Sequence, residues 1–140
     1  MIGNMNIAVV DDIKEERDAL KSALSDYAVS SGISIDFCEF ESAEALLDGY
    51  RPYLFTVIFM DIYMDGMTGI EAAEKIRSMD RKALFIFLTT SDAYMSNALK
   101  LHAFDYLEKP ASVERIFSVM DDLLEQHTQS ISEKEPKLSF

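Results

Sequence analysis

The chain has 140 residues, of which 49% are hydrophobic, so it fits a single domain with a real core and excludes wholesale disorder. Its 25 acidic and 13 basic side chains give a formal net charge of −12, so these residues are not expected to bind the phosphate backbone of nucleic acid. No apolar run is long enough for a membrane span, and no signal peptide is visible. Cys38 is the single cysteine, so no internal disulfide can form, and we expect a cytoplasmic location. We expect its side chain to be buried or half-buried.

Short apolar runs alternate with amphipathic stretches along the chain. The apolar runs predict five strands, at Asn6–Val10, Ile33–Phe40, Leu54–Met60, Ala83–Thr90 and Phe104–Glu108. The second run alternates between apolar and polar residues, which is typical of a half-exposed edge strand. The first, third and fourth are apolar throughout, as strands covered on both faces are.

A helix is predicted after each strand, at Ile13–Ser30, Ser42–Leu47, Thr68–Met79, within Asp92–Leu101, and from Pro110 through Leu124. Ser42 can cap the second helix, and the pattern Thr68-Gly-Ile-Glu71 predicts a capping box for the third. The predicted inward residues are Ile13, Leu20, Leu24 and Tyr27 in the first helix, and Val113, Ile116, Phe117, Met120 and Leu124 in the last. We expect one domain over residues 1–126, followed by a polar linker or stub over residues 127–140.

Strict alternation of strands and helices predicts a parallel sheet with helices on both faces. In such a sheet, ligands bind outside the carboxyl ends of the strands. Five polar residues stand at those ends, namely Asp11, Asp12, Asp61, Thr89 and Lys109. If the first and third strands are neighbours, three carboxylates converge there, which is a donor set that suits Mg²⁺.

A cation, a lysine, a hydroxyl and a carboxylate together form a site for a phosphoryl group, and the carboxylate can act as its covalent acceptor. Each of these five residues taken alone has an ordinary explanation, such as a helix cap, a turn or a strand end. Because all five fall on the same edge of the predicted sheet, the sequence favours a common site.

The sequence resembles the receiver domain of two-component response regulators over roughly its first 125 residues. The resemblance is carried by "VVDD" at Val9–Asp12, "FMDIYMDGMTGIE" at Phe59–Glu71, "FLTTSDAY" at Phe87–Tyr94 and "AFDYLEKP" at Ala103–Pro110. It implies a flavodoxin-like (βα)5 fold with a parallel sheet in strand order 2-1-3-4-5. It also implies a cis bond between Lys109 and Pro110.

The resemblance also implies a role for each site residue. Asp61 would be the phosphorylated residue, and Asp11, Asp12, Asp61 and the backbone carbonyl of Tyr63 would bind Mg²⁺. Thr89 and Lys109 would bind the phosphoryl group, and Thr89 with the aromatic Tyr106 would form the switch. The donor would be a sensor histidine kinase, and the chain would not be an enzyme with an external substrate. It would accept the phosphoryl group on its own Asp61 and assist its own phosphorylation and dephosphorylation.

The segment "TTSDAYMSNALKLHAFDYLEKP" further resembles receivers that precede a LytTR-type DNA-binding domain. This implies a homodimer on activation, and contact with DNA only through an output domain that is not in this chain. The alternative is a stand-alone receiver that acts in a phosphorelay or as a protein-interaction module. His102 stands where such receivers often have glycine, and we expect it to end a helix in a strained conformation.

A Mg²⁺-dependent phosphatase of the haloacid dehalogenase type is a second alternative, because that family also uses an aspartate after an apolar strand. It requires a second acid two residues after the nucleophile. Tyr63 stands at that position here, so the spacing disfavours this reading.

Overall fold

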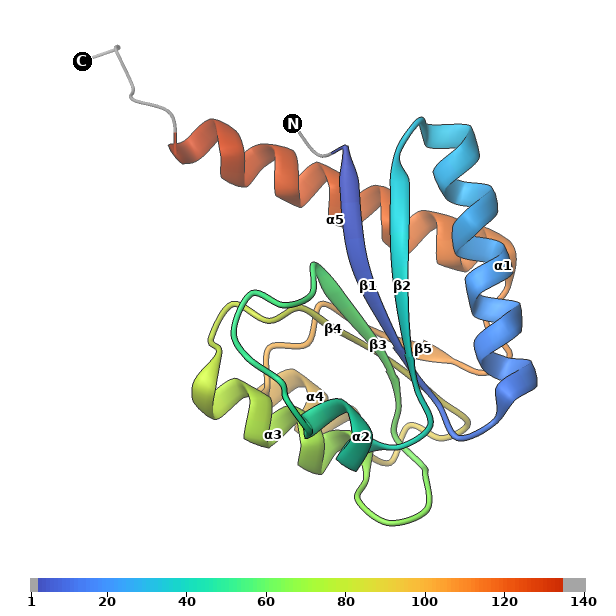
Figure 1. The fold of residues 1–140 in the computed structure, drawn as a ribbon, viewed down its shortest axis with the longest axis vertical. Helices are drawn as coiled ribbons and strands as arrows, with labels where there is room; N and C mark the ends of the chain where they lie inside the picture. The colour runs from blue at the N-terminus through green and yellow to red at the C-terminus, as the bar shows by residue number, and fades with distance from the viewer. Residues whose placement is uncertain (1–2, 135–140) are drawn as a thin grey trace.

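The computed structural model describes residues 3–134, in which strands and helices alternate. The strands are β1 (Asn4–Val10), β2 (Ser34–Phe40), β3 (Val57–Asp61), β4 (Phe85–Thr89) and β5 (Asp105–Glu108). The helices are α1 (Lys14–Ser31), α2 (Ala43–Leu47), α3 (Gly69–Met79), α4 (Met95–Lys100) and α5 (Val113–Lys134). The strands pair in parallel in the order β2-β1-β3-β4-β5 (Figure 1), which confirms the predicted flavodoxin-like α/β fold.

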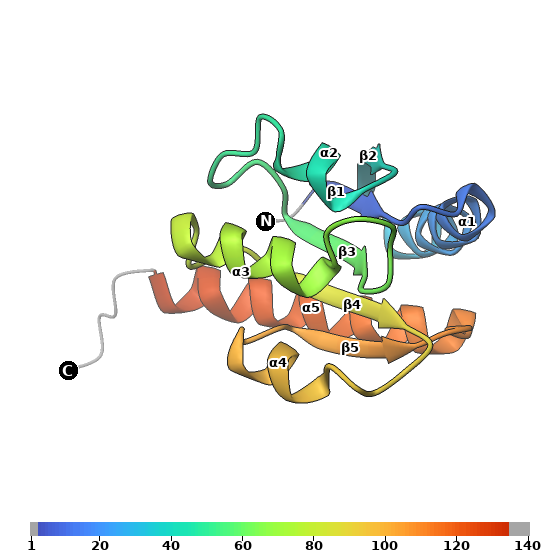
Figure 2. The same cartoon turned by 90° about the horizontal axis from the view of Figure 1, so that it is seen from below.

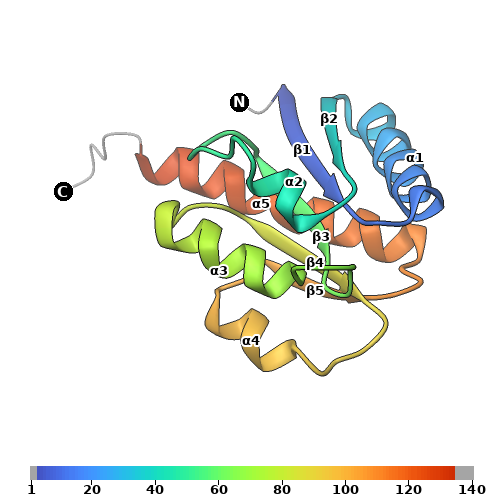
Figure 3. The same ribbon diagram turned by 60° about the horizontal axis from the view of Figure 1, so that its bottom comes forward.

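Helices cover both faces of the sheet and give the molecule two cores (Figure 3). Successive strand residues point to opposite faces, so neighbours such as Val9 and Val10 belong to different cores. One core lies under α1 and α5, and the other lies under α2, α3 and α4. Every residue of β3 and β4 is buried, whereas β2 alternates between exposed and half-buried residues, as predicted for inner and edge strands.

The predicted start signals of α2 and α3 are both present. The Ser42 hydroxyl accepts a hydrogen bond from the Ala45 amide. Thr68 and Glu71 form the complete capping box, in which each side chain accepts from the other residue's amide. Gly69 follows this cap against the end of β3, where an added Cβ would overlap the Asp61 carbonyl oxygen. A glycine is therefore needed for α3 to begin so close to Asp61.

Three predictions about burial are wrong. Ile13 and Val113 were expected to face inward, but they are 47% and 49% exposed, because each stands at the first residue of its helix or just before it. Their helices enter the core about one turn later, and the inner face of α5 also includes Val119 and Leu123. Cys38 is exposed, because edge strand β2 leaves it uncovered.

The last helix continues to Lys134, past the expected end of the domain at residue 126. The sequence from Gln126 to Lys134 contains no glycine or proline, so the helix that starts on the core can propagate. Residues 135–140 of the expected linker lie outside the described residues.

Two backbone expectations are confirmed. His102, directly after the Leu101 cap of α4, has a positive φ of 57°, and the Lys109–Pro110 peptide bond is cis. In the part of the chain that the structure describes, no helix combines the length and apolar character that crossing a membrane requires.

Candidate metal and phosphoryl site

Three carboxylates meet at the carboxyl edge of the sheet. Asp61 is the last residue of β3, and Asp11 and Asp12 directly follow β1, which is its neighbour in the sheet. One carboxylate oxygen from each residue lies within 4.8 Å of the other two. Asp11 and Asp61 are buried, at 6% and 5% exposure, whereas Asp12 is exposed. The arrowheads of β3, β4 and β5 in Figure 2 point to this same edge.

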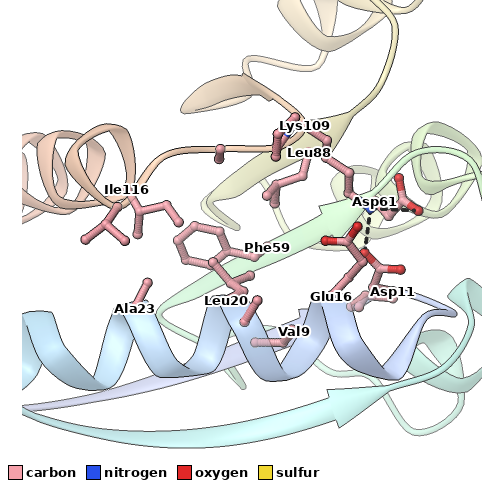
Figure 4. Close-up of a pocket in the computed structure, with 15 residues that line it drawn as sticks. Val9, Asp11, Glu16, Leu20, Ala23, Phe59, Asp61, Leu88, Lys109 and Ile116 are labelled. Atoms are coloured by element: carbon pink, nitrogen blue, oxygen red, sulfur yellow. Dashed lines mark hydrogen bonds and ion pairs between the residues drawn. The ribbon is translucent and has the colours of Figure 1, made fainter.

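Lys109 reaches the acids from the end of β5. Its Nζ lies 2.7 Å from Oδ2 of Asp11 and 3.5 Å from Oδ2 of Asp61. Figure 4 shows the side chain bridging these two carboxylates. The Lys109 amide also donates to the Thr89 carbonyl at 2.7 Å, which fixes the chain just after the strand. The site thus combines three acids with one directly bound ammonium.

The charges and burial of Asp61 and Lys109 shift the pKa values of both side chains. Burial of the Asp61 carboxyl is the main reason that its pKa rises to about 6, with Lys109 acting to lower it and Asp11 to raise it. Burial acts to lower the pKa of Lys109, but its hydrogen bond to Asp11 and the charges of Asp61 and Asp11 outweigh burial, and the pKa is raised. Lys109 therefore does not offset the cost of burying the charge of Asp61.

Backbone amides orient each acid. Oδ1 of Asp11 accepts from the Ile13 amide at 3.0 Å, and Oδ1 of Asp61 accepts from the Tyr63 amide at 3.3 Å. Oδ2 of Asp12 lies 3.4 Å from the Asp65 amide, across the gap between the two loops. The contacts of Asp11 and Asp61 are local turns that follow directly from an aspartate at a strand end, whereas the contact of Asp12 joins two loops.

Thr89 and Tyr106 lie on the neighbouring strands β4 and β5. Thr89 is fully buried at the end of β4, and its hydroxyl lies 3.4 Å from the Ser91 amide. Tyr106 is half-buried, and its hydroxyl donates to the Ser91 carbonyl at 2.8 Å. The two predicted switch residues are thus joined through the loop that follows β4, although neither contacts the three acids directly through a hydrogen bond.

Tyr63 was singled out for its backbone carbonyl, and that role stays a prediction. Its side chain is 41% exposed and packs edge-on against Tyr94, with 5.5 Å between the ring centroids. The aromatic pair lies between the loops that follow β3 and β4.

The donor set fits Mg²⁺. Carboxylate oxygens are the hard ligands that this ion prefers, and it usually retains several waters while binding one or two protein carboxylates. The exposure of Asp12 leaves the cluster open to solvent on one side. Asp11, Asp12 and Asp61 could therefore hold the ion, and the Lys109 ammonium beside Asp61 could bind an anion.

Arg17, a residue of α1 that is only 7% exposed, was not among the site residues predicted from the sequence. Its Nη1 donates to the backbone carbonyl of Asp11 at 2.7 Å. The available signal was its position one turn before Leu20, on the inner face of an amphipathic helix.

A pocket of about 190 Å³ adjoins the acids on the face covered by α1 and α5. Its apolar walls come from α1, α5, the strands beneath them and the loop before α5, while Asp11, Glu16, Asp61 and Lys109 are its charged residues (Figure 4).

Comparison with known proteins identifies the family. The family model described as the response regulator receiver domain matches residues 7–121 of this chain. The sensory transduction protein LytT of Oceanobacillus iheyensis is 35% identical over 120 residues, which cover 84% of this chain and 47% of that protein. The sensory transduction protein LytR of Staphylococcus haemolyticus is 30% identical over 126 residues, which cover 90% of this chain and 48% of that protein. The chain thus spans about half the length of these curated relatives.

Solved structures of receiver domains have the same fold as this chain. The REC domain of AraT, a response regulator from Geobacillus stearothermophilus, has the same fold, with a TM-score of 0.75 at 24% identity over 90% of this chain and 97% of that chain. The BeF3-activated DrrB receiver domain has a TM-score of 0.68 at 26% identity, over 89% of this chain and 99% of that chain. The relatives LytT and LytR agree with the predicted LytTR-type subfamily. The chain therefore belongs to the response regulator receiver domain family and is a receiver domain of two-component signalling.

Proposed function

We propose that the domain accepts a phosphoryl group on Asp61 from a sensor histidine kinase, with Mg²⁺ bound by Asp11, Asp12 and Asp61. The observation that carries the proposal is the convergence of the three carboxylates within 4.8 Å of one another, with Lys109 bound to two of them. Receiver domains generally interact with histidine kinases, which supports the choice of partner.

In the proposed reaction, a carboxylate oxygen of Asp61 attacks the phosphorus atom of a phosphohistidine. The P–O bond forms as the P–N bond breaks, and the electron pair of that bond stays on the imidazole, which takes up a proton. Lys109 meets the negative oxygens of the phosphoryl group, and Thr89 donates its hydroxyl to one of them. Bound Mg²⁺ would neutralise charge on the transferring oxygens.

The same residues would assist hydrolysis of the acyl phosphate, so the domain is a self-modifying acceptor rather than an enzyme with an external substrate. We place this exchange in the cytoplasm. We also assign residues 1–126 to the receiver domain.

We further propose that phosphorylation controls dimerisation and a DNA-binding output domain. The support is the likeness to LytT and LytR, about half of whose length this chain spans. The alternative is a receiver that works alone in a phosphorelay or as an interaction module. Measuring DNA binding by the complete gene product, with and without activation, separates the two.

The acceptor role is tested with acetyl phosphate and Mg²⁺. We expect one phosphoryl group per chain, stable to acid and labile to base, because it is an acyl phosphate. Asp61→Asn should abolish the modification, since an amide is not a usable nucleophile here. Intact-protein mass spectrometry gives the stoichiometry.

The matched control is Asp65→Asn, which removes an exposed acid from the loop after β3 and should leave the stoichiometry unchanged. Stoichiometric and persistent labelling of the Asp61→Asn protein would overturn the assignment of the acceptor.

A further inference from the structure

Arg17 is a buried cation beside the acidic site. It lies in the first turn of α1, the helix that runs beside β2 in Figure 1. Its Nε donates to Oε1 of Glu39 on β2 at 3.1 Å, and its Nη1 donates to the Asp11 carbonyl at 2.7 Å. Lys21 binds the second oxygen of Glu39 at 2.8 Å.

Burial of a guanidinium is costly unless its donors are satisfied, so these contacts explain how Arg17 can be buried. The hydrogen bond from Lys21, followed by that from Arg17, holds the pKa of Glu39 below its usual range, which keeps the carboxylate charged. Lys21, Glu39 and Arg17 thus form a chain of contacts that ends on the backbone of Asp11.

The contact to the Asp11 carbonyl completes the restraint of that residue. The Asp11 amide donates to the Phe40 carbonyl at 3.1 Å, and its side chain is held by the Ile13 amide and by Lys109. The carbonyl is the remaining polar group, and it belongs to the peptide bond that connects Asp11 to Asp12. Arg17 therefore fixes the peptide plane from which the exposed Asp12 side chain projects.

We propose that Arg17 is a positioning residue for metal binding: its guanidinium, held by Glu39, orients the Asp11–Asp12 peptide so that both carboxylates face Asp61. This inference rests on the proposed function of the three acids as the Mg²⁺ site. Arg17 acts through the backbone and does not touch the ion.

An effect of Arg17 through its charge and an effect through positioning the acids would change Mg²⁺ affinity in opposite directions. If Arg17 acted only through its charge, its removal would take a cation away from the site and strengthen Mg²⁺ binding. If Arg17 positions the acids, its removal weakens Mg²⁺ binding, as loss of an outer partner of a metal ligand does.

The experiment measures the Mg²⁺ dissociation constant by isothermal titration calorimetry on the parent, Arg17→Met and Arg17→Lys proteins. Circular dichroism and thermal unfolding establish at what temperature each is folded. We expect the Met variant to bind Mg²⁺ about tenfold more weakly. The Lys variant keeps the charge but cannot span Glu39 and the Asp11 carbonyl, so it should bind Mg²⁺ more weakly than the parent and more tightly than the Met variant.

A second readout separates positioning from a loss of stability. With acetyl phosphate as the donor, the Mg²⁺ concentration for half-maximal labelling should rise in both variants, while the rate at saturating Mg²⁺ stays near that of the parent. Arg115→Lys is the matched control, because Arg115 on α5 forms an ion pair with Asp105 on β5, and the change should leave both values unchanged.

Parental or tighter Mg²⁺ affinity in folded Arg17→Met protein overturns the inference. If that variant does not fold, parental affinity in Arg17→Lys overturns it instead. A parent protein that binds no Mg²⁺ contradicts the proposed function itself, so the two failures are distinguishable.

Discussion

Asp61 is a buried carboxylate at a site that contains more acids than directly bound bases. It shares the ammonium of Lys109 with Asp11, and that ammonium lies closer to Asp11. Without a metal ion, the charge on Asp61 therefore opposes folding. Asn has nearly the same shape as Asp and carries no charge, so it isolates this effect.

We expect Asp61→Asn to raise the free energy of unfolding of metal-free protein by about 1 kcal/mol, because the change removes a buried charge and its repulsion from Asp11 but also its ion pair with Lys109. For a domain of this size the melting temperature should rise by about 4 °C. Thermal unfolding in a chelating buffer at neutral pH provides the measurement.

Mg²⁺ gives the complementary measurement, because it should stabilise the parent more than the variant by binding to the folded state. Asp26→Asn is the control for net charge, since Asp26 is an exposed acid of α1 outside the site, and it should have little effect. A fall in the melting temperature of Asp61→Asn would mean that Asp61 is a structural residue whose hydrogen bond to the Tyr63 amide outweighs the repulsion.

At the level of elements, hydrophobic periodicity predicted all ten helices and strands of the described residues, because buried parallel strands and capped helices have distinct signals. The signal failed at helix starts. Ile13 and Val113 fit the periodic pattern, but their helices have not yet reached the core at these positions. Periodicity describes a helix face and does not show where the neighbouring element begins to cover it.

Tyr27 joins the two helices that cover one face of the sheet. It is 2% exposed, its hydroxyl donates to Oδ1 of Asp121 on α5 at 2.7 Å, and its ring meets Phe117 edge-on with 5.1 Å between centroids. Burial first, and then the hydrogen bond to Asp121, raises the pKa of Tyr27 to about 12.

We expect Tyr27→Phe to lower the free energy of unfolding by about 1 kcal/mol at neutral pH, because one hydrogen bond is lost. The raised pKa adds a pH dependence: the contribution of the Tyr27 hydroxyl is fully present below pH 10 and is lost as the pH rises toward 12. The difference between parent and variant should therefore shrink from pH 10 to pH 11, as measured by urea unfolding.

Tyr53→Phe is the control, because Tyr53 is 77% exposed. Its stability should follow that of the parent across the same pH range. A Tyr27→Phe protein whose deficit stays constant up to pH 11 would show that the hydroxyl does not titrate as described.

At the level of the whole molecule, the site follows from topology. The strand order places β1 beside β3, and parallel strands bring the residues at their carboxyl ends to one edge. Strand ends in the sequence were therefore enough to predict that Asp11, Asp12, Asp61 and Lys109 meet. Arg17 could not be predicted in the same way. Its partners are Glu39 on β2 and the backbone carbonyl of Asp11, and the sequence around Arg17 contains no pattern that indicates either contact.

The same topology connects the site to a distant surface. Thr89 ends β4, which is the neighbour of β3, and Lys109 follows β5, which is the next strand in the sheet. Tyr106 on β5 binds the loop after β4 through the Ser91 carbonyl. Beside β5 stands α4 (Figure 2), whose exposed apolar side chains include Met95 at 41% and Leu99 at 68% exposure. A phosphoryl group that draws Thr89 toward Asp61 would disturb the loop that Tyr106 holds, and with it this surface.

We expect beryllofluoride with Mg²⁺ to strengthen self-association of the parent by about tenfold, within the usual range for coupling between two sites. Thr89→Ala should still accept a phosphoryl group on Asp61 but lose most of this response, because the hydroxyl that senses the group is gone. Sedimentation velocity gives the association constants, and mass spectrometry gives the labelling.

Thr90→Ala, at the exposed neighbouring threonine, is the control and should respond like the parent. A full response in Thr89→Ala would contradict the coupling through Thr89, whereas a parent that stays monomeric when activated would contradict the proposed dimer alone.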